Sequence, residues 1–285
     1  MSVYRVITIL LFIATLTIFS VSCGRQINFS SPPGYDLNRP TTIYLPTDLN
    51  EISGIIYYQK DTSIFAISDA SGSLYKIFPA KNILVQKWKF GSNHDYEDLQ
   101  RVDSTFYILS SSGDIVSVKF SKHAPMLVTE FKIHDKEKNE FETLYFDSVL
   151  RKLILVCKDC EEDKKNTVST RAFDISSNTY TKGPYTINVN TIDSSMKLKK
   201  IKFKPSAAAI NPLTHELFIL ASVNKMLVIA DTNGNVKHSY LLRPSIYKQP
   251  EGIAFTPSGT LLISNESDKT GSADILVIKH QNQAK

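Results

Sequence analysis

Residues 250–265 read PEGIAFTPSGTLLISN. This segment predicts one β-hairpin, because two short apolar runs flank a turn that contains Pro257 and Gly259. Similar hairpins occur at four earlier positions, and the five begin at Ser53, Glu97, Glu142, Ser206 and Glu251. The steps between these starts are 44, 45, 64 and 45 residues, so the chain contains an internal repeat.

Each hairpin is followed by further strand-like runs, which makes a unit of four strands in roughly 45 residues, the length of one β-propeller blade. The longer third step indicates an insertion within the polar segment 160–200. The last unit has only three strands, and residues 41–45 (TTIYL) can supply the fourth. We therefore predict an all-β fold for residues 41–285: a five-bladed β-propeller of four-stranded blades, with the ring closed by an N-terminal strand in the last blade.

The first 40 residues lie outside the repeat. Residues 6–21 are mostly apolar, too few for a comfortable membrane span but typical of a signal peptide. Cys23 follows, as in bacterial lipoprotein signals in which this cysteine is lipidated. We expect a lipoprotein-type signal peptide at 1–22 and a polar tether at 23–40, with an uncleaved anchor or simple secretion as the alternatives.

The residue after Cys23 is Gly24 rather than Asp, so the resemblance to Gram-negative lipoproteins points to a membrane-anchored protein of the outer membrane or periplasm. Several acyl chains would hold the protein firmly at that membrane. The formal net charge of +5 selects no partner by itself. The basic run at 196–205 (MKLKKIKFKP) is either a surface for anionic headgroups or glycans, or a solvated strand edge. An export signal argues against nucleic acid, and we expect a monomer.

Two cysteines remain if Cys23 carries lipid. Cys157 and Cys160 form a CxxC motif (CKDC) without a second pair, which is a weak zinc signal because four ligands are normally required. A disulfide in an oxidising compartment, two free thiols, and a metal or redox role all remain open.

The candidate site follows from stacking the repeats. If the five hairpins start on the innermost strands, Glu97, Glu142 and Glu251 share one ring around the channel, with Ser53 and Ser206. Two residues earlier stand Glu51, Asp95, Glu140, Lys204 and Gln249, and strand side chains repeat with period two. Converging carboxylates raise one another's pKa values unless a cation neutralises them.

Ca²⁺ is the cation that we expect in this ring, because it takes six to eight oxygens in irregular geometry. Asp69 and Glu266, at the ends of second strands in the first and fifth blades, are further candidate ligands, and Glu51 belongs to the second tier. The alternatives are a polar, water-filled channel for the ring, and strand-end capping for Asp69 and Glu266.

Five motifs in order carry a resemblance to a known family: EISGI (51–55), DYEDL (95–99), FETLYFD (141–147), SAAAINPLTHELFIL (206–220) and PEGIAFTPSGTLLIS (250–264). Together they resemble the SdiA-regulated, YjiK-like proteins over roughly residues 42–280. The resemblance implies an NHL-related five-bladed propeller with a calcium site in the exported part of the protein. The chain departs from the family at the fourth blade, where PSAAA replaces an acidic or Gly-containing start, and in the long insertion at 160–200, so we expect no ligand from Ser206.

Two classes of function fit these patterns. The first is a non-enzymatic cell-envelope module that binds an unknown glycan, peptide or protein. The second is a Ca²⁺-dependent hydrolase similar to lactonase or phytase-like propellers, with His94 as the candidate base beside the ring. His94 is otherwise an exposed loop histidine. We favour the binding module, because a hydrolase would need further bases or a clamp of Lys and Arg in the channel.

Overall fold

The computed structural model describes residues 29–79, 83–121, 126–134, 138–164, 166–196, 201–268 and 271–281, with 193–196 described for the backbone only. The predicted signal peptide, Cys23 and the first part of the predicted tether lie outside these residues. Within the described part of the chain, no helix has the length and apolar character needed to cross a membrane.

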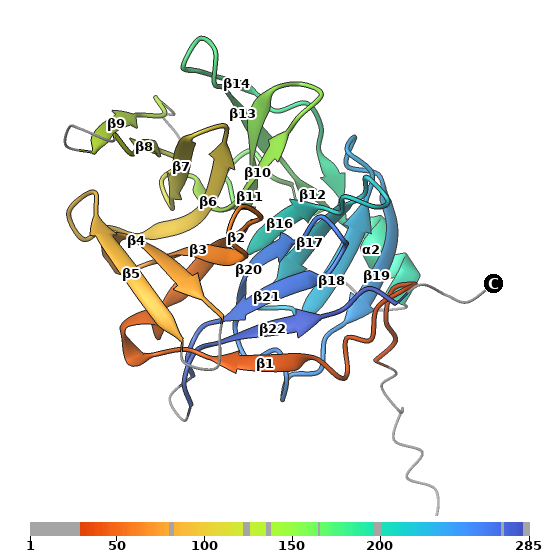
Figure 1. The fold of residues 1–285 in the computed structure, drawn as a ribbon. Coiled ribbons are helices and arrows are strands. Elements are labelled where there is room, and N and C mark those ends of the chain that lie inside the picture. The colour runs from red at the N-terminus through yellow and green to blue at the C-terminus, as the bar shows by residue number, and fades with distance from the viewer. Residues whose placement is uncertain are drawn as a thin grey trace, which may run out of the picture.

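The described chain forms five antiparallel sheets of four strands each, arranged around a common centre (Figure 1). The first blade contains β2 (Ile52–Tyr58), β3 (Ser63–Ser68), β4 (Ser71–Phe78) and β5 (Leu84–Lys89). The second contains β6 (Tyr96–Val102), β7 (Thr105–Ser110), β8 (Ile115–Lys119) and β9 (Leu127–Phe131). The third contains β10 (Glu140–Asp147), β11 (Lys152–Asp159), β13 (Thr170–Asp174) and β14 (Thr179–Lys182). The fourth contains β16 (Ala207–Ile210), β17 (Leu217–Ala221), β18 (Met226–Ala230) and β19 (Val236–Leu241).

The fifth blade joins the two ends of the propeller. It contains β20 (Pro250–Phe255), β21 (Leu261–Asn265) and β22 (Asp274–Ile278), and its outermost strand is β1 (Thr41–Tyr44). β1 lies beside β22 (Figure 1) and runs antiparallel to it, with Ile43 opposite Ile275. This arrangement confirms the predicted five-bladed propeller and its closure by an N-terminal strand.

The innermost strands form a closed ring. β2 contacts β6 and β20, β6 contacts β10, β10 contacts β16, and β16 contacts β20. The hydrophobic core lies between blades, because each sheet packs its faces on its neighbours. Phe65 and Ile67 of the first blade, for example, pack in one cluster with Leu99 and Ile108 of the second. The outer strands are more exposed, as the residues of β5 show.

The longer third unit contains additional elements. The short strands β12 (Thr167–Val168) and β15 (Ile187–Asn188) form a two-stranded sheet, and α2 (Val189–Met196) follows. These elements lie within the segment 160–200, where the repeat spacing indicates an insertion.

The described end of the predicted tether packs against the propeller. Leu37 is 2% exposed, and the Tyr35 hydroxyl donates to the Gly259 carbonyl oxygen at 2.8 Å and accepts from Asn211 Nδ2 at 2.9 Å. Gly259 and Asn211 belong to the fifth and fourth blades, so the chain is fixed to these blades before β1 begins.

Candidate functional site

Three glutamates of the repeat occupy irregular positions in the innermost strands. In β6, Tyr96 is opposite Ser110 and Asp98 is opposite Leu109, so Glu97 has no partner residue. The same register shift leaves Glu142 of β10 and Glu251 of β20 unpaired. Such β-bulges re-aim a side chain and are common beside functional sites. The bulge is therefore the local feature that positions each glutamate.

A backbone hydrogen bond that recurs in three blades fixes where the neighbouring acidic side chains lie along the propeller axis. The N–H groups of Asp69, Ser111 and Glu266, each just beyond its blade's second strand, donate to the carbonyl oxygens of Glu51, Asp95 and Gln249 at 3.1, 3.0 and 2.9 Å. Adjacent blades are joined at the same level, since the Tyr96 N–H donates to the Asp69 carbonyl oxygen at 3.0 Å. One mouth of the axial channel thus gathers the acidic cluster: Glu51, Asp69, Asp95, Glu97, Glu251 and Glu266.

Burial and mutual repulsion disfavour charge on Glu97 and Glu251. Burial raises the pKa of Glu97 to about 8, and the charges of Asp95, Glu251 and Asp69 act in the same direction. Burial also raises the pKa of Glu251, against a hydrogen bond from Ser222 that lowers it. These glutamates come from the second and fifth blades, so the tertiary fold brings them into electrostatic contact.

The first and fifth blades add two further carboxylates. Burial, followed by the charges of Glu251, Asp69 and Glu51, raises the pKa of Glu266 to about 7. Burial and the adjacent Glu51 raise the pKa of Asp69 to about 6. Asp69 Oδ1 is buried and finds no hydrogen-bond donor in the described chain. The acidic cluster therefore includes a buried oxygen that is free to accept a ligand.

Glu142 has a different environment from the other two ring glutamates. Lys158, at the end of β11, forms an ion pair with Glu142 and a second with Glu140, whose Oε1 lies 2.7 Å from Lys158 Nζ. Lys158 is also close enough to lower the pKa values of Glu97 and Glu251. We did not identify this lysine as part of the site from sequence. The signal was present, because Lys158 occupies the repeat position that Asp69 occupies in the first blade.

His94 lies beside the acidic cluster but is exposed to solvent. Its Nδ1 accepts the backbone N–H of Asp95 at 2.7 Å, and its ring centroid lies 5.6 Å from that of Tyr96. A neutral imidazole that accepts at Nδ1 carries its proton on Nε2. In this arrangement the other ring nitrogen is a donor, which does not suit a general base.

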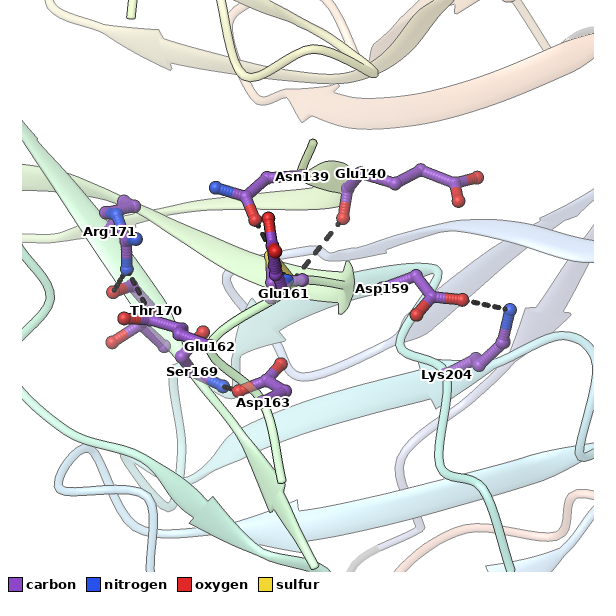
Figure 2. The surroundings of a disulfide bond; sticks show 12 residues. Asn139, Glu140, Asp159, Glu161, Glu162, Asp163, Ser169, Thr170, Arg171 and Lys204 are labelled. Atoms are coloured by element: carbon purple, nitrogen blue, oxygen red, sulfur yellow. Dashed lines mark hydrogen bonds and ion pairs between the residues drawn. A yellow bond between two sulfur atoms is a disulfide. The ribbon is translucent and has the colours of Figure 1, made fainter. Parts of the chain in front are cut away.

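Cys157 and Cys160 are joined by a disulfide, and Figure 2 shows the residues around it. Around it, Asp159 accepts from Lys204 Nζ at 3.0 Å, and Asp163 Oδ1 accepts from the Ser169 N–H at 2.7 Å (Figure 2). Among the described residues, Cys157, Cys160 and Asp163 are the one group of three whose possible ligand atoms lie within 4.8 Å of one another. Bonded sulfurs offer no thiolates, so this group does not fit a metal.

The carboxylates of the acidic cluster lie farther apart than this. Among the described residues, no three of them have oxygens that all lie within 4.8 Å of one another. A cation at this mouth would therefore complete its coordination with water or carbonyl oxygens. An all-oxygen, irregular and partly hydrated donor set fits Ca²⁺, which accepts variable geometry, and does not fit metals that prefer nitrogen or sulfur ligands.

A closed ring of five four-stranded blades, with carboxylates gathered at one end of its innermost strands, defines a five-bladed β-propeller. A family model described as SdiA-regulated matches residues 37–269, and the chain belongs to the SdiA-regulated family. A sequence search of curated proteins finds no match.

Several solved structures share this fold. The glutaminyl cyclase of Myxococcus xanthus is 13% identical with a TM-score of 0.54, and the match covers 85% of this chain and 97% of that one. A luciferin-regenerating enzyme is 9% identical with a TM-score of 0.53, and the match covers 85% and 95%. Regucalcin from Agrobacterium tumefaciens, described as a calcium-binding protein, is 14% identical with a TM-score of 0.51, and the match covers 89% and 96%. At these identities the likeness is one of fold.

Proposed function

We propose that this chain is a calcium-binding β-propeller that acts as a non-enzymatic binding module at the cell envelope. The observation that carries the proposal is the convergence of Glu97, Glu251, Asp69 and Glu266 at one axial mouth, where each pKa is raised. A divalent cation would offset the repulsion among these groups. The calcium-binding description of regucalcin, which shares the fold, is consistent with this proposal.

Within the proposal, the ligands come from Glu97, Glu251, Asp69 and Glu266, with Glu51 next to Asp69. Since no three of these carboxylates lie within 4.8 Å of one another, at most two bind the cation directly in this geometry and the others bind it through water. Asp69 Oδ1 supports this assignment, because it is a buried oxygen without a described donor. Glu142 has a different role in the proposal. Its ion pair with Lys158 neutralises that lysine and keeps it from opposing the cation.

Calorimetric titration with Ca²⁺ tests the metal site. We expect binding by the wild type and a loss of at least about tenfold in affinity in Glu97→Gln and in Glu251→Gln, because each variant removes one charged ligand. Glu130→Gln is the matched control, since Glu130 is an exposed glutamate on β9. Unchanged affinity in both ring variants, or no binding by a folded wild type, would remove the metal from the proposal.

The envelope location rests on the sequence of the first 23 residues. The apolar run 6–21 followed by Cys23 supports export and lipidation, with the propeller held to the outer membrane by its lipid. In this setting a monomeric propeller would meet a glycan, peptide or protein in the envelope, and not nucleic acid. Labelled palmitate should enter the wild type but not Cys23→Ala. Labelling that persists in the variant would contradict lipidation at this residue.

A Ca²⁺-dependent hydrolase is the alternative function. Similar folds do occur in enzymes, as the glutaminyl cyclase and luciferin-regenerating enzyme indicate. Against this alternative, His94 is exposed and its Nδ1 already accepts a backbone hydrogen bond. Screening lactones, phosphate esters and aryl esters with Ca²⁺ separates the two functions. Turnover that His94→Ala abolishes would favour the hydrolase.

A further inference from the structure

The channel has a second mouth with a different chemical character. A cavity of about 440 Å³ lies three to four residues farther along the innermost strands than the acidic cluster, on the side of the hairpin turns. Every blade contributes to its wall, and the contributing residues include Ile55, Arg101, Phe146, Ile210 and Phe255. Its volume is in the range of small-molecule sites, which are mostly apolar with a few polar groups.

Among the described residues, Arg101 is the one charged side chain that lines this cavity. Its guanidinium lies 4.9 Å from the ring centroid of Tyr58 and 5.9 Å from that of Phe106. Cation–π contacts of this kind hold the flat guanidinium in place but use none of its N–H groups. Within the described residues, no carboxylate forms an ion pair with Arg101. The cavity therefore combines mostly apolar side chains with one positive charge that lacks a described protein anion.

The other polar group on this part of β6 is already engaged. Gln100 Nε2 donates to the Leu144 carbonyl oxygen of the neighbouring blade at 3.0 Å. Gln100 is thereby used to join two blades, which leaves Arg101 as the group that can select a charged ligand. A single guanidinium matches one carboxylate in charge and in its paired donor geometry, whereas a phosphate dianion would call for further positive groups.

We propose that this second mouth binds a small apolar molecule that carries one carboxylate. The apolar body lies among Ile56, Ile210 and Phe255, which line the cavity and are only partly buried, and the carboxylate accepts from Arg101. The proposal is independent of calcium, because its residues are separate from the acidic cluster. A cationic ligand is disfavoured by Arg101, and a neutral one leaves the guanidinium without a partner.

Three ten-carbon probes that differ only in the head group test the proposal: decanoate, decanol and decylamine, each titrated below its aggregation concentration. We expect decanoate to bind the wild type most tightly and decylamine most weakly. Arg101→Met should lower the affinity for decanoate by at least about tenfold, to the affinity for decanol, because a charge-assisted hydrogen bond is lost. Lys87→Met is the control, since Lys87 also stacks on a ring, 5.1 Å from the centroid of Tyr75, but lies on β5.

If Arg101→Met does not fold, Ile210→Trp provides a second test of the same cavity. Ile210→Trp should fill the cavity and abolish binding of decanoate and decanol together, while Ca²⁺ binding stays as in the wild type. Glu97→Gln should leave decanoate binding unchanged. The proposal is overturned if decanoate binds no better than decylamine, or if a folded Arg101→Met or Ile210→Trp variant binds decanoate like the wild type.

Discussion

At the scale of single residues, ionisation of the acidic cluster destabilises the folded state. Glu97 shows this most clearly, because burial and three neighbouring carboxylates all oppose its ionisation. A carboxyl group whose pKa is raised on folding stabilises the protein fully below its unfolded pKa. That contribution is lost as the pH rises through the folded value. For Glu97 the window extends from 4.5 to about 8.

In a chelating buffer we therefore expect the wild type to lose stability between about pH 5 and pH 8, and Glu97→Gln to lose less of it. At pH 8 the variant should be more stable by about 2 kcal/mol, a value reduced from the full pKa shift because Glu97 is not completely buried. Urea unfolding at both pH values measures the difference. Equal pH dependence in the two proteins would show that Glu97 ionises freely in the folded state.

Asp98, the next residue, has a structural role that we did not recognise from sequence. Asp98 is 3% exposed, and its carboxylate accepts the N–H groups of Leu99 and Leu144, both at 2.8 Å, so it links the second blade to the third. Asp98→Ala leaves both N–H groups without an acceptor and should cost about 3 kcal/mol in urea unfolding. The exposed Asp48 gives the control, Asp48→Ala. A similar small effect in both variants would contradict this linking role.

At the scale of elements, the hairpins were predictable and the bulges were not. Alternating apolar runs around turn residues predict the hairpin of 250–265, and the structure has β20 and β21 there. A bulge adds one residue to one strand and leaves no mark in hydrophobicity, so the unpaired state of Glu97 depends on its partner strand. The close approach of neighbouring innermost strands is equally hidden in the sequence.

Gly54 tests that close approach between β2 and β6. A Cβ at residue 54 would lie 2.7 Å from Asp98 Cα and 2.3 Å from Asp98 Oδ1. Gly54→Ala should therefore destabilise the protein by about 2 kcal/mol, since backbone would have to move. In Gly271→Ala the nearest atom is Lys248 Nζ, the mobile end of a side chain, and thermal unfolding should change little. Equal melting temperatures for both variants would contradict tight packing at Gly54.

At the scale of the whole molecule, stability depends on closing the ring between β1 and β22. The Leu45 N–H donates to the Ala273 carbonyl oxygen at 2.9 Å, and the register continues with Ile43 opposite Ile275. Hydrogen-bonded pairs alternate along antiparallel strands, so the N–H of Ile43 faces β22 and that of Thr42 faces outward. Proline substitutions at Ile43 and at Thr42 should therefore change the melting temperature by different amounts.

Ile43→Pro removes a hydrogen bond that closes the ring and should lower the melting temperature by roughly 5–10 °C, given about 2–4 °C per kcal/mol for a domain of this size. Thr42→Pro removes an N–H that makes no bond within the sheet and should change the melting temperature much less. Calorimetry of both variants measures the effect. Equal melting temperatures would show that β1 contributes little to closure.

The spacing of similar hairpins was sufficient to predict the number of blades and the closing strand, because each unit must bury its faces against its neighbours. The identity of the ring glutamates followed from the same spacing. Only the tertiary structure could separate Glu142, which is paired with Lys158, from Glu97 and Glu251, whose charges oppose each other. The physical reason is that repeat position determines where a side chain stands along the axis, whereas its charge environment depends on residues that other blades bring to it.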